Sequence, residues 1–190
     1  MTESDLTVLE PGTKERIAAL VGRSVDGGGP VAGLGAGAGP RIAFACAEFN
    51  GGISDRLLTG ALDALKNASC DLGTVTVAWA PGAFELPLVA KVLAESGAVD
   101  AVICLGAVIR GDTGHYDFVA GQCAAGIQQV QLDTGVPVVF GVLTTDTVDQ
   151  ALVRSEDDEA NKGREAAMTA VEMIRLLGVL GRDTLPEVGD

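Results

Sequence analysis

From Arg41 onward, the sequence alternates short apolar runs with longer segments in which apolar residues recur every three or four positions. The apolar runs suit buried strands and cover residues 41–47, 74–78, 100–107 and 138–143. Between them lie stretches long enough for helices, and the sequence has no internal repeat. Strands separated by helices form βαβ units, whose strands run parallel.

The expected helices have recognisable starts. Ser54 suits the N-cap of a helix that carries Leu57 and Leu65 on one face, and Pro87 suits the first turn of the next. Three more helices are expected, from about His115, over 147–154 and over 162–180. We therefore predict an α/β fold, a three-layer sandwich with a four-stranded parallel, flavodoxin-like sheet and helices on both faces.

The first 40 residues differ from the rest in composition. Residues 10–21 suit a short helix, whereas residues 27–40 contain seven glycines in fourteen positions, as flexible linkers do. We expect an arm over 1–40 that is partly flexible or draped over a neighbour, a domain over 41–182 and a tail over 183–190.

Composition restricts the partners. Hydrophobic residues make up 47% of the 190 residues and the mean hydropathy is +0.33, so excess apolar surface is expected in subunit interfaces. No signal peptide or membrane span is recognisable, which predicts a cytoplasmic protein without a membrane partner. A net charge of -13 argues against nucleic acid, and it means that any phosphate must be bound by local cations and backbone N–H groups. Arg110, Arg154 and Lys162 are the candidate cations.

The cysteines and the single histidine do not suggest a metal site. Cys46, Cys70, Cys104 and Cys123 form no C-x-x-C pair, so we expect no zinc and no other metal. Buried, reduced thiols are the expected state of cysteines within apolar segments.

Ligands of an open parallel sheet bind beyond the carboxyl ends of its strands, and one loop there suits an anion. Residues 111–114, Gly-Asp-Thr-Gly, lead into the helix that begins near His115, where free N–H groups bind anions without a net positive charge. A helix N-terminus disfavours imidazolium, so a neutral His115 is expected as a proton shuttle. The alternative is a surface histidine at a helix start.

Other residues at the same sheet edge are ambiguous on their own. Phe49 follows the first strand, either as a platform for a flat heterocycle or as ordinary packing. Phe84 shares this ambiguity, and Glu85 either holds sugar-alcohol hydroxyls or simply favours a helix start.

Five collinear motifs resemble the lumazine synthase family over residues 41–178. They are Phe49-Asn50, Pro81 to Pro87 (PGAFELP), Gly106 to Asp117 (GAVIRGDTGHYD), Gly141 to Thr145 (GVLTT) together with Gln150-Ala151, and Asn161-Lys162-Gly163. One such motif would be weak, but five in the family's order and spacing are specific.

The resemblance implies a riboflavin-pathway transferase that needs no cofactor or metal. It would condense 5-amino-6-(D-ribitylamino)uracil with 3,4-dihydroxy-2-butanone 4-phosphate to 6,7-dimethyl-8-ribityllumazine, with release of phosphate and water. The implied catalytic residue is His115. The implied substrate-binding residues are Phe49, Ala83, Phe84, Glu85, Val108, Ile109, Gly111, Asp112, Thr113, Phe140, Arg154 and Lys162.

Within the resemblance, Phe49 stacks on the pyrimidinedione, while Ala83, Phe84 and Glu85 lie along the ribityl chain. The backbone near Val108 and Ile109 contacts the heterocycle, and residues 111–113 hold the phosphate. Phe140, Arg154 and Lys162 would reach the site from a neighbouring subunit, since the family forms homo-pentamers or shells of pentamers. From the sequence alone, Arg154 also suits a solvated helix end.

The sequence departs from the usual family pattern at Glu48, at Gly114 and over 155–159 (SEDDE), where added acids could weaken phosphate binding. Two alternatives remain at this stage. One is a riboflavin synthase on the same fold, and the other is a non-catalytic flavin-binding shell protein.

Overall fold

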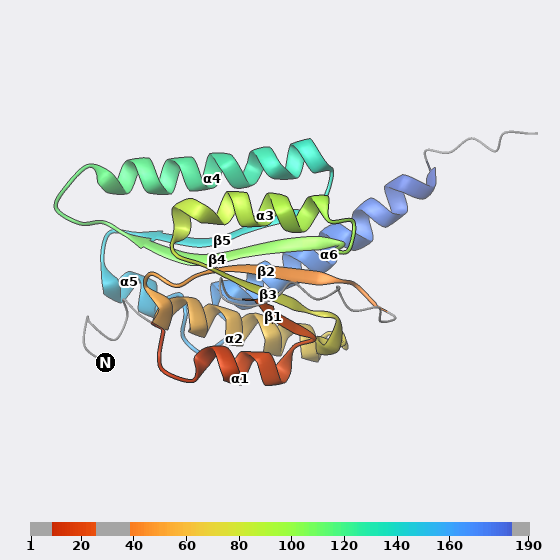
Figure 1. Cartoon of the computed structure of the whole chain (residues 1–190), viewed down its shortest axis with the longest axis horizontal. Helices are drawn as coiled ribbons and strands as arrows, with labels where there is room; N and C mark the ends of the chain where they lie inside the picture. The colour runs from red at the N-terminus through yellow and green to blue at the C-terminus, as the bar shows by residue number, and fades with distance from the viewer. Residues whose placement is uncertain (1–8, 26–38, 184–190) are drawn as a thin grey trace, which may run out of the picture.

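The core of the fold is a sheet of five parallel strands in the order β1-β3-β2-β4-β5 (Figure 1). The structure is a computed structural model that describes residues 9–25 and 39–183. The strands are β1 (Arg23–Val25), β2 (Ile42–Ala47), β3 (Thr76–Ala80), β4 (Ala101–Ile109) and β5 (Val138–Thr145). The predicted α/β class and the four predicted parallel strands are confirmed, and β1 is an additional edge strand that the sequence analysis missed.

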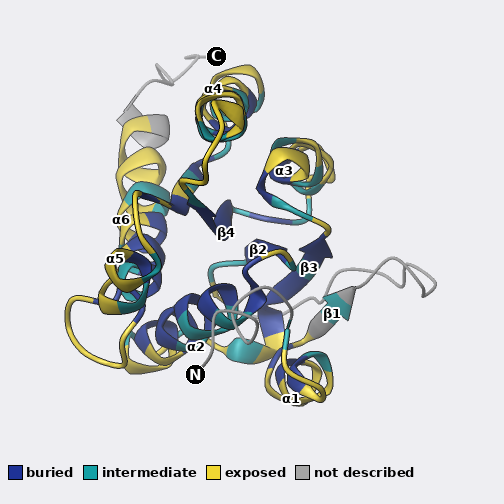
Figure 2. Cartoon of the chain, turned by 90° about the vertical axis from the view of Figure 1, so that its left-hand side faces the viewer, coloured by how far each residue is buried: buried dark blue, intermediate teal, exposed yellow. Residues whose placement is uncertain are grey.

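Helices cover both faces of the sheet. On one face lie α1 (Thr13–Leu20), α2 (Gly51–Asn67) and α6 (Lys162–Asp183), and on the other α3 (Leu86–Glu95) and α4 (His115–Thr134) (Figure 2). The short helix α5 (Val148–Val153) follows β5, and the 3-10 turns η2 (Leu72–Thr74) and η3 (Ala83–Glu85) flank β3. The sheet thus has one hydrophobic cluster on each side, as three layers require.

The strand predictions succeeded because the central strands are buried on both faces. Every residue of β2 is buried, and in β4 all are buried except Ile109, because helices cover both faces of the sheet. Continuous burial selects continuous apolar runs rather than alternating ones.

The start of α2 differs from the expectation. Asn50, not Ser54, is the N-cap, and it takes a left-handed conformation (φ 57°) that asparagine tolerates. Ser54 lies inside the helix, fully buried, and its hydroxyl has no hydrogen-bond partner among the described residues.

Part of the N-terminal arm belongs to the folded body. Ile17 of α1 is fully buried in the cluster beneath the sheet, and Arg16 and Lys14 form ion pairs with Asp55 and Glu48. The short helix expected over residues 10–21 is present as α1, and it packs against the domain. The glycine-rich part of the arm falls mainly on 26–38, and most of the expected tail on 184–190, both outside the described residues.

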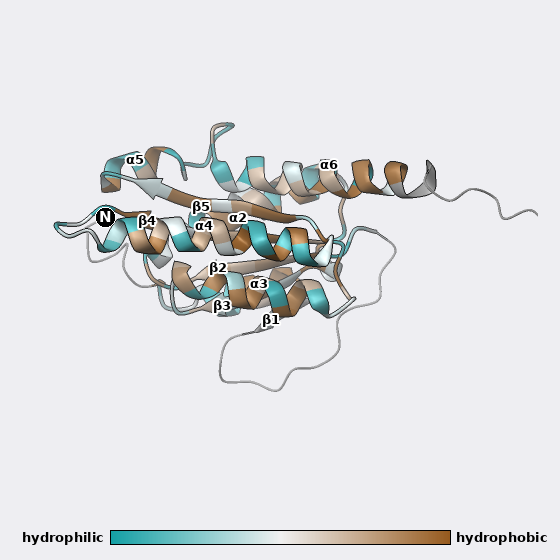
Figure 3. Cartoon of the chain, turned by 90° about the horizontal axis from the view of Figure 1, so that it is seen from above, coloured by the Kyte–Doolittle hydropathy of each residue, from teal (hydrophilic) through white to brown (hydrophobic). Residues whose placement is uncertain are grey.

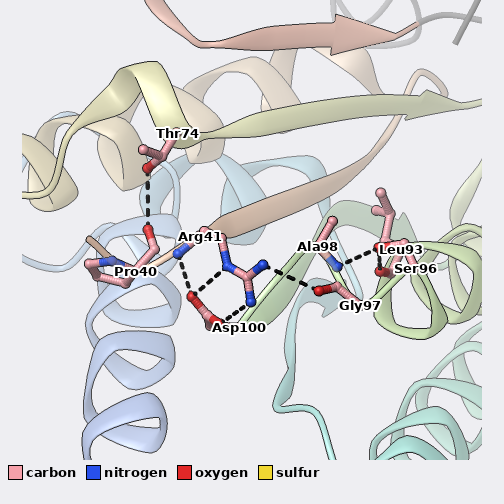
Figure 4. A network of polar contacts seen from close by, with 8 residues as sticks. All are labelled: Pro40, Arg41, Thr74, Leu93, Ser96, Gly97, Ala98 and Asp100. Carbon is pink, nitrogen blue, oxygen red and sulfur yellow. Dashed lines mark hydrogen bonds and ion pairs between the residues drawn. The ribbon is translucent and has the colours of Figure 1, made fainter. Parts of the chain in front are cut away.

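At the amino ends of the strands, a charged clamp joins β2 to β4 (Figure 4). Arg41 donates to Asp100 from its backbone N–H at 2.8 Å and from its guanidinium Nη2 at 2.6 Å, and a further guanidinium bond reaches the carbonyl of Gly97. The bond from Arg41 lowers the pKa of Asp100. This clamp lies at the end of the sheet opposite the predicted ligand site.

Several large apolar side chains remain exposed on the helices. They include Leu88 and Val92 on α3, Phe118 and Leu132 on α4, and Leu176 and Leu180 in the C-terminal turns of α6, which Figure 3 colours largely hydrophobic. Of the described helices, none is long and apolar enough to cross a membrane.

Candidate functional site

A cleft of about 770 Å³ opens at the carboxyl ends of β2, β3 and β4. It is walled by the loops that follow these strands and by the first turns of α4. Its lining residues are Phe49, Asn50, Pro81, Gly82, Ala83, Phe84, Glu85, Ala107, Val108, Ile109, Gly111, Thr113, His115, Tyr116, Phe118 and Val119. The cleft therefore brings together all but four of the predicted site residues.

One side of the cleft is the predicted anion loop. Helix α4 begins at His115 behind the N-cap Gly114, which has no side chain to cap the helix, so the positive end of the helix dipole stays open to an anion. The Thr113 hydroxyl accepts a bond from the His115 N–H at 3.4 Å. Asp112 lies exposed in the same loop but does not line the cleft.

Arg110 stands at the base of this loop with its charge already engaged. It donates to Asp146 at 2.9 Å and to Asp117 at 3.3 Å, and its guanidinium lies 4.0 Å from the centre of the Tyr116 ring. The bond to Asp146 and the charge of Asp117 raise the pKa of Arg110. Arg110 does not line the cleft. Its bond to Asp117 instead ties the two ends of the loop together.

The opposite side of the cleft is apolar and aromatic. Phe49 and Phe84 are 61% and 56% exposed although they are the largest side chains of their loops, because their rings border the open cleft rather than the core. Exposed rings at the edge of a cleft suit stacking on a planar heterocycle.

Asn50 was not assigned a role from the sequence. It is almost fully buried, and its side-chain Nδ2 donates to the backbone carbonyl of Ala107 at 2.9 Å, which joins the loop after β2 to β4. An asparagine directly before two glycines at a strand end was the available signal, since such a position favours left-handed backbone.

The remaining three predicted residues lie elsewhere. Phe140, Arg154 and Lys162 line a second cleft of about 390 Å³ between the edge strand β5 and α6. Arg154 Nη1 donates to the Gln150 carbonyl at 2.9 Å, and Lys162 pairs with Glu165. Within one chain, these residues are not brought to the first cleft.

Metal and thiol chemistry are not suggested by the arrangement. In residues 9–25 and 39–183, no three histidine, cysteine, aspartate or glutamate side chains are placed to hold a metal ion. Burial, aided by Glu85, raises the pKa of Cys123 to about 11, and burial also raises the pKa of Cys46 and Cys104. These three cysteines are protonated thiols near neutral pH.

Together, the parallel sheet, the aromatic wall and the uncapped helix start define a flavodoxin-like α/β protein whose cleft suits a flat ring beside an anion. Comparison with known proteins narrows this class. Residues 39–178 match the family model of 6,7-dimethyl-8-ribityllumazine synthase, and the chain belongs to this family.

Two curated relatives agree. The 6,7-dimethyl-8-ribityllumazine synthase of Edwardsiella ictaluri (strain 93-146) is 54% identical over 138 residues, which cover 72% of this chain and 88% of the relative. That of Protochlamydia amoebophila (strain UWE25) is 55% identical over 136 residues, covering 72% and 79%. The relatives favour the synthase over the riboflavin synthase and shell-protein alternatives.

Proposed function

We propose that this chain is the riboflavin-pathway transferase that forms 6,7-dimethyl-8-ribityllumazine, with the larger cleft as its substrate site. It condenses 5-amino-6-(D-ribitylamino)uracil with 3,4-dihydroxy-2-butanone 4-phosphate. The observation that carries this proposal is that every residue lining the cleft lies within residues 39–178, the part that matches the family.

The pyrimidinedione occupies the aromatic side of the cleft. Phe49 stacks on its ring, and the backbone of Val108 and Ile109, at the end of β4, contacts its polar edge. The ribityl chain runs along η3, past Ala83 and Phe84, where the exposed Glu85 accepts from its hydroxyls. Exposure of both rings and of Glu85 in the free protein supports this placement.

The phosphate of the second substrate binds at the start of α4. Gly111, Asp112 and Thr113 provide the loop, and the start of the helix provides backbone N–H donors and a favourable dipole. Backbone donors explain how a chain with a net charge of -13 holds an anion.

The reaction proceeds by proton transfers beside this anion. The 5-amino group adds to the carbonyl carbon, and loss of water gives an imine. Removal of a proton expels phosphate, and the ribitylamino nitrogen then closes the ring with loss of a second water. His115, at the first position of α4, exchanges these protons, and much of the acceleration comes from holding both reactants together.

A complete site takes residues from two subunits. Phe140, Arg154 and Lys162 lie in a separate cleft beside β5, an edge strand with no partner on its outer side among the described strands. In a homo-pentamer, or a shell of pentamers, this cleft faces the larger cleft of the neighbouring subunit, so that Arg154 reaches its phosphate. The exposed apolar residues of α3, α4 and α6 support burial in such interfaces. Because Cys46, Cys70, Cys104 and Cys123 are all unpaired, we also propose a cytoplasmic location.

The direct test is an assay with both purified substrates. We expect lumazine absorbance and phosphate release in equal amounts. Incubation with lumazine alone is the control, because riboflavin formed from it would identify the alternative synthase. Tight binding of the pyrimidinedione without turnover would contradict the proposal and favour the non-catalytic alternative.

A further inference from the structure

The two cations of the second cleft stand at the two ends of one loop. Arg154 ends α5, Lys162 begins α6, and the Lys162 N–H donates to the Arg154 carbonyl at 2.9 Å. This hydrogen bond joins the two ends of the loop formed by residues 155–161. Arg154 and Lys162 therefore flank the same short loop.

Asn161 fastens this loop with its whole side chain. It is 1% exposed, and its Oδ1 accepts from the N–H groups of Gly163 at 2.9 Å and Arg164 at 3.2 Å, which caps α6. Its Nδ2 donates to the Glu156 carbonyl at 2.8 Å and to the Arg56 carbonyl of α2 at 3.4 Å. All four hydrogen-bonding positions of the amide are thus used.

The amide is held against the backbone of α2. A Cβ atom on Gly60 would lie 2.6 Å from the Asn161 side chain, so only glycine leaves room for it. The Asn161 amide therefore has little room to move against α2. Its bond to the Glu156 carbonyl in turn fixes the position at which the acidic loop begins.

The loop carries four consecutive acidic residues, Glu156 to Glu159, between the two cations. In the part of the chain that the structure describes, none of them pairs with Arg154 or Lys162. Asp158 instead accepts from the N–H of Ala160 at 2.8 Å. Opposite charges this close in sequence attract, so a restraint is needed to keep them apart.

We infer that Asn161 is a positioning residue that holds the four carboxylates of the acidic loop away from Arg154 and Lys162, so that these carboxylates do not compete with substrate phosphate for the two cations. This inference rests on the proposed shared site. Once the fastening is released, loop carboxylates fold back onto the cations and compete with phosphate.

The test is the Asn161→Ser variant, because serine preserves the helix cap but lacks the amide that donates to Glu156 and Arg56. We expect KM for the phosphate substrate, and the inhibition constant of inorganic phosphate, to rise about three- to tenfold, the effect of one or two exposed ion pairs. KM for the pyrimidinedione should stay unchanged. Asn67→Ser, at the exposed end of α2, is the matched control.

A second set of substitutions tests whether the loss of phosphate affinity comes from the loop carboxylates rather than from a general structural defect. Converting Glu156, Asp157, Asp158 and Glu159 to their amides should restore phosphate affinity to the Asn161→Ser variant. The inference is overturned if Asn161→Ser leaves phosphate affinity unchanged, or if the amides do not restore it. Arg154→Ala is measured alongside, because unchanged phosphate affinity in that variant would overturn the shared site itself and the inference with it.

Discussion

At the residue scale, His115 places an imidazole in the first turn of α4, beside the proposed anion site. We expect His115→Ala to lower kcat about a hundredfold, the low end for loss of a general acid–base group when proximity carries much of the rate. Steady-state kinetics at saturating substrate measure this. Gln128→Ala, exposed on the same helix, is the control, and an unchanged kcat for His115→Ala would remove His115 from the mechanism.

Phe49 is expected to act on binding rather than on chemistry. Its ring would stack on the pyrimidinedione equally in the ground and transition states, so Phe49→Ala should raise KM for that substrate about three- to tenfold and spare kcat. If only KM for the phosphate substrate rises, the placement of Phe49 is wrong.

Asp100 is expected to affect stability without affecting catalysis. Asp100→Asn should lower the free energy of unfolding by about 1–2 kcal/mol at pH 7, a charged hydrogen bond discounted for partial exposure. Because the pKa of Asp100 is lowered in the folded state, its contribution is present above the ordinary pKa of about 3.9 and is lost as pH falls through the folded pKa.

Chemical denaturation at pH 7 and pH 3 tests this, and the difference between wild type and variant should shrink at pH 3. The control is Glu95→Gln, which breaks an exposed pair with Lys91 and should change little. A difference that grows on acidification would contradict the assigned role of Asp100.

At the element scale, Gly163 lets the start of α6 lie directly against the backbone of α2. A Cβ on Gly163 would lie 1.9 Å from the Leu57 carbonyl oxygen, so Gly163→Ala should force the helices apart and cost about 1–3 kcal/mol of stability. Gly178→Ala, in the same helix with no atom near its Cβ, should be neutral or slightly stabilising. Thermal unfolding of the two variants side by side measures the contrast, and equal melting temperatures would refute it.

The same scale shows what the sequence could predict. Strands β2 and β4 were predictable because burial on both faces demands unbroken apolar runs. The start of α2 was not, because Ser54 and Asn50 both suit an N-cap and only the left-handed backbone at Asn50 decides between them. Strand β1 has three residues, too few for a periodic signal.

The larger cleft was predictable because parallel strands place their loops at one edge, so residues from three motifs converge there. The ion pairs of Arg110 with Asp117 and Asp146 could not be predicted, because such contacts depend on the fold of the loop rather than on sequence spacing.

At the scale of the whole molecule, the separation of the two clefts predicts complementation between variants. If one subunit supplies His115 and its neighbour supplies Arg154, then rings refolded from a mixture of His115→Ala and Arg154→Ala chains contain some intact sites. Activity should exceed the mean of the two pure variants after joint refolding, but not after mixing preassembled oligomers, because large apolar interfaces exchange slowly. Mixed rings that show only the mean activity would place the site within one subunit.

The clamp of Arg41 and Asp100 and the proposed substrate cleft lie at opposite ends of the same strands. Mutations that adapt the protein to heat or acid can therefore accumulate at the amino ends of the strands while the carboxyl ends, which carry the proposed substrate cleft, are preserved. Relatives from hot or acidic habitats should differ most around residues 41, 97 and 100. The same end of the sheet is where a peptide or label can be grafted with the least cost to turnover.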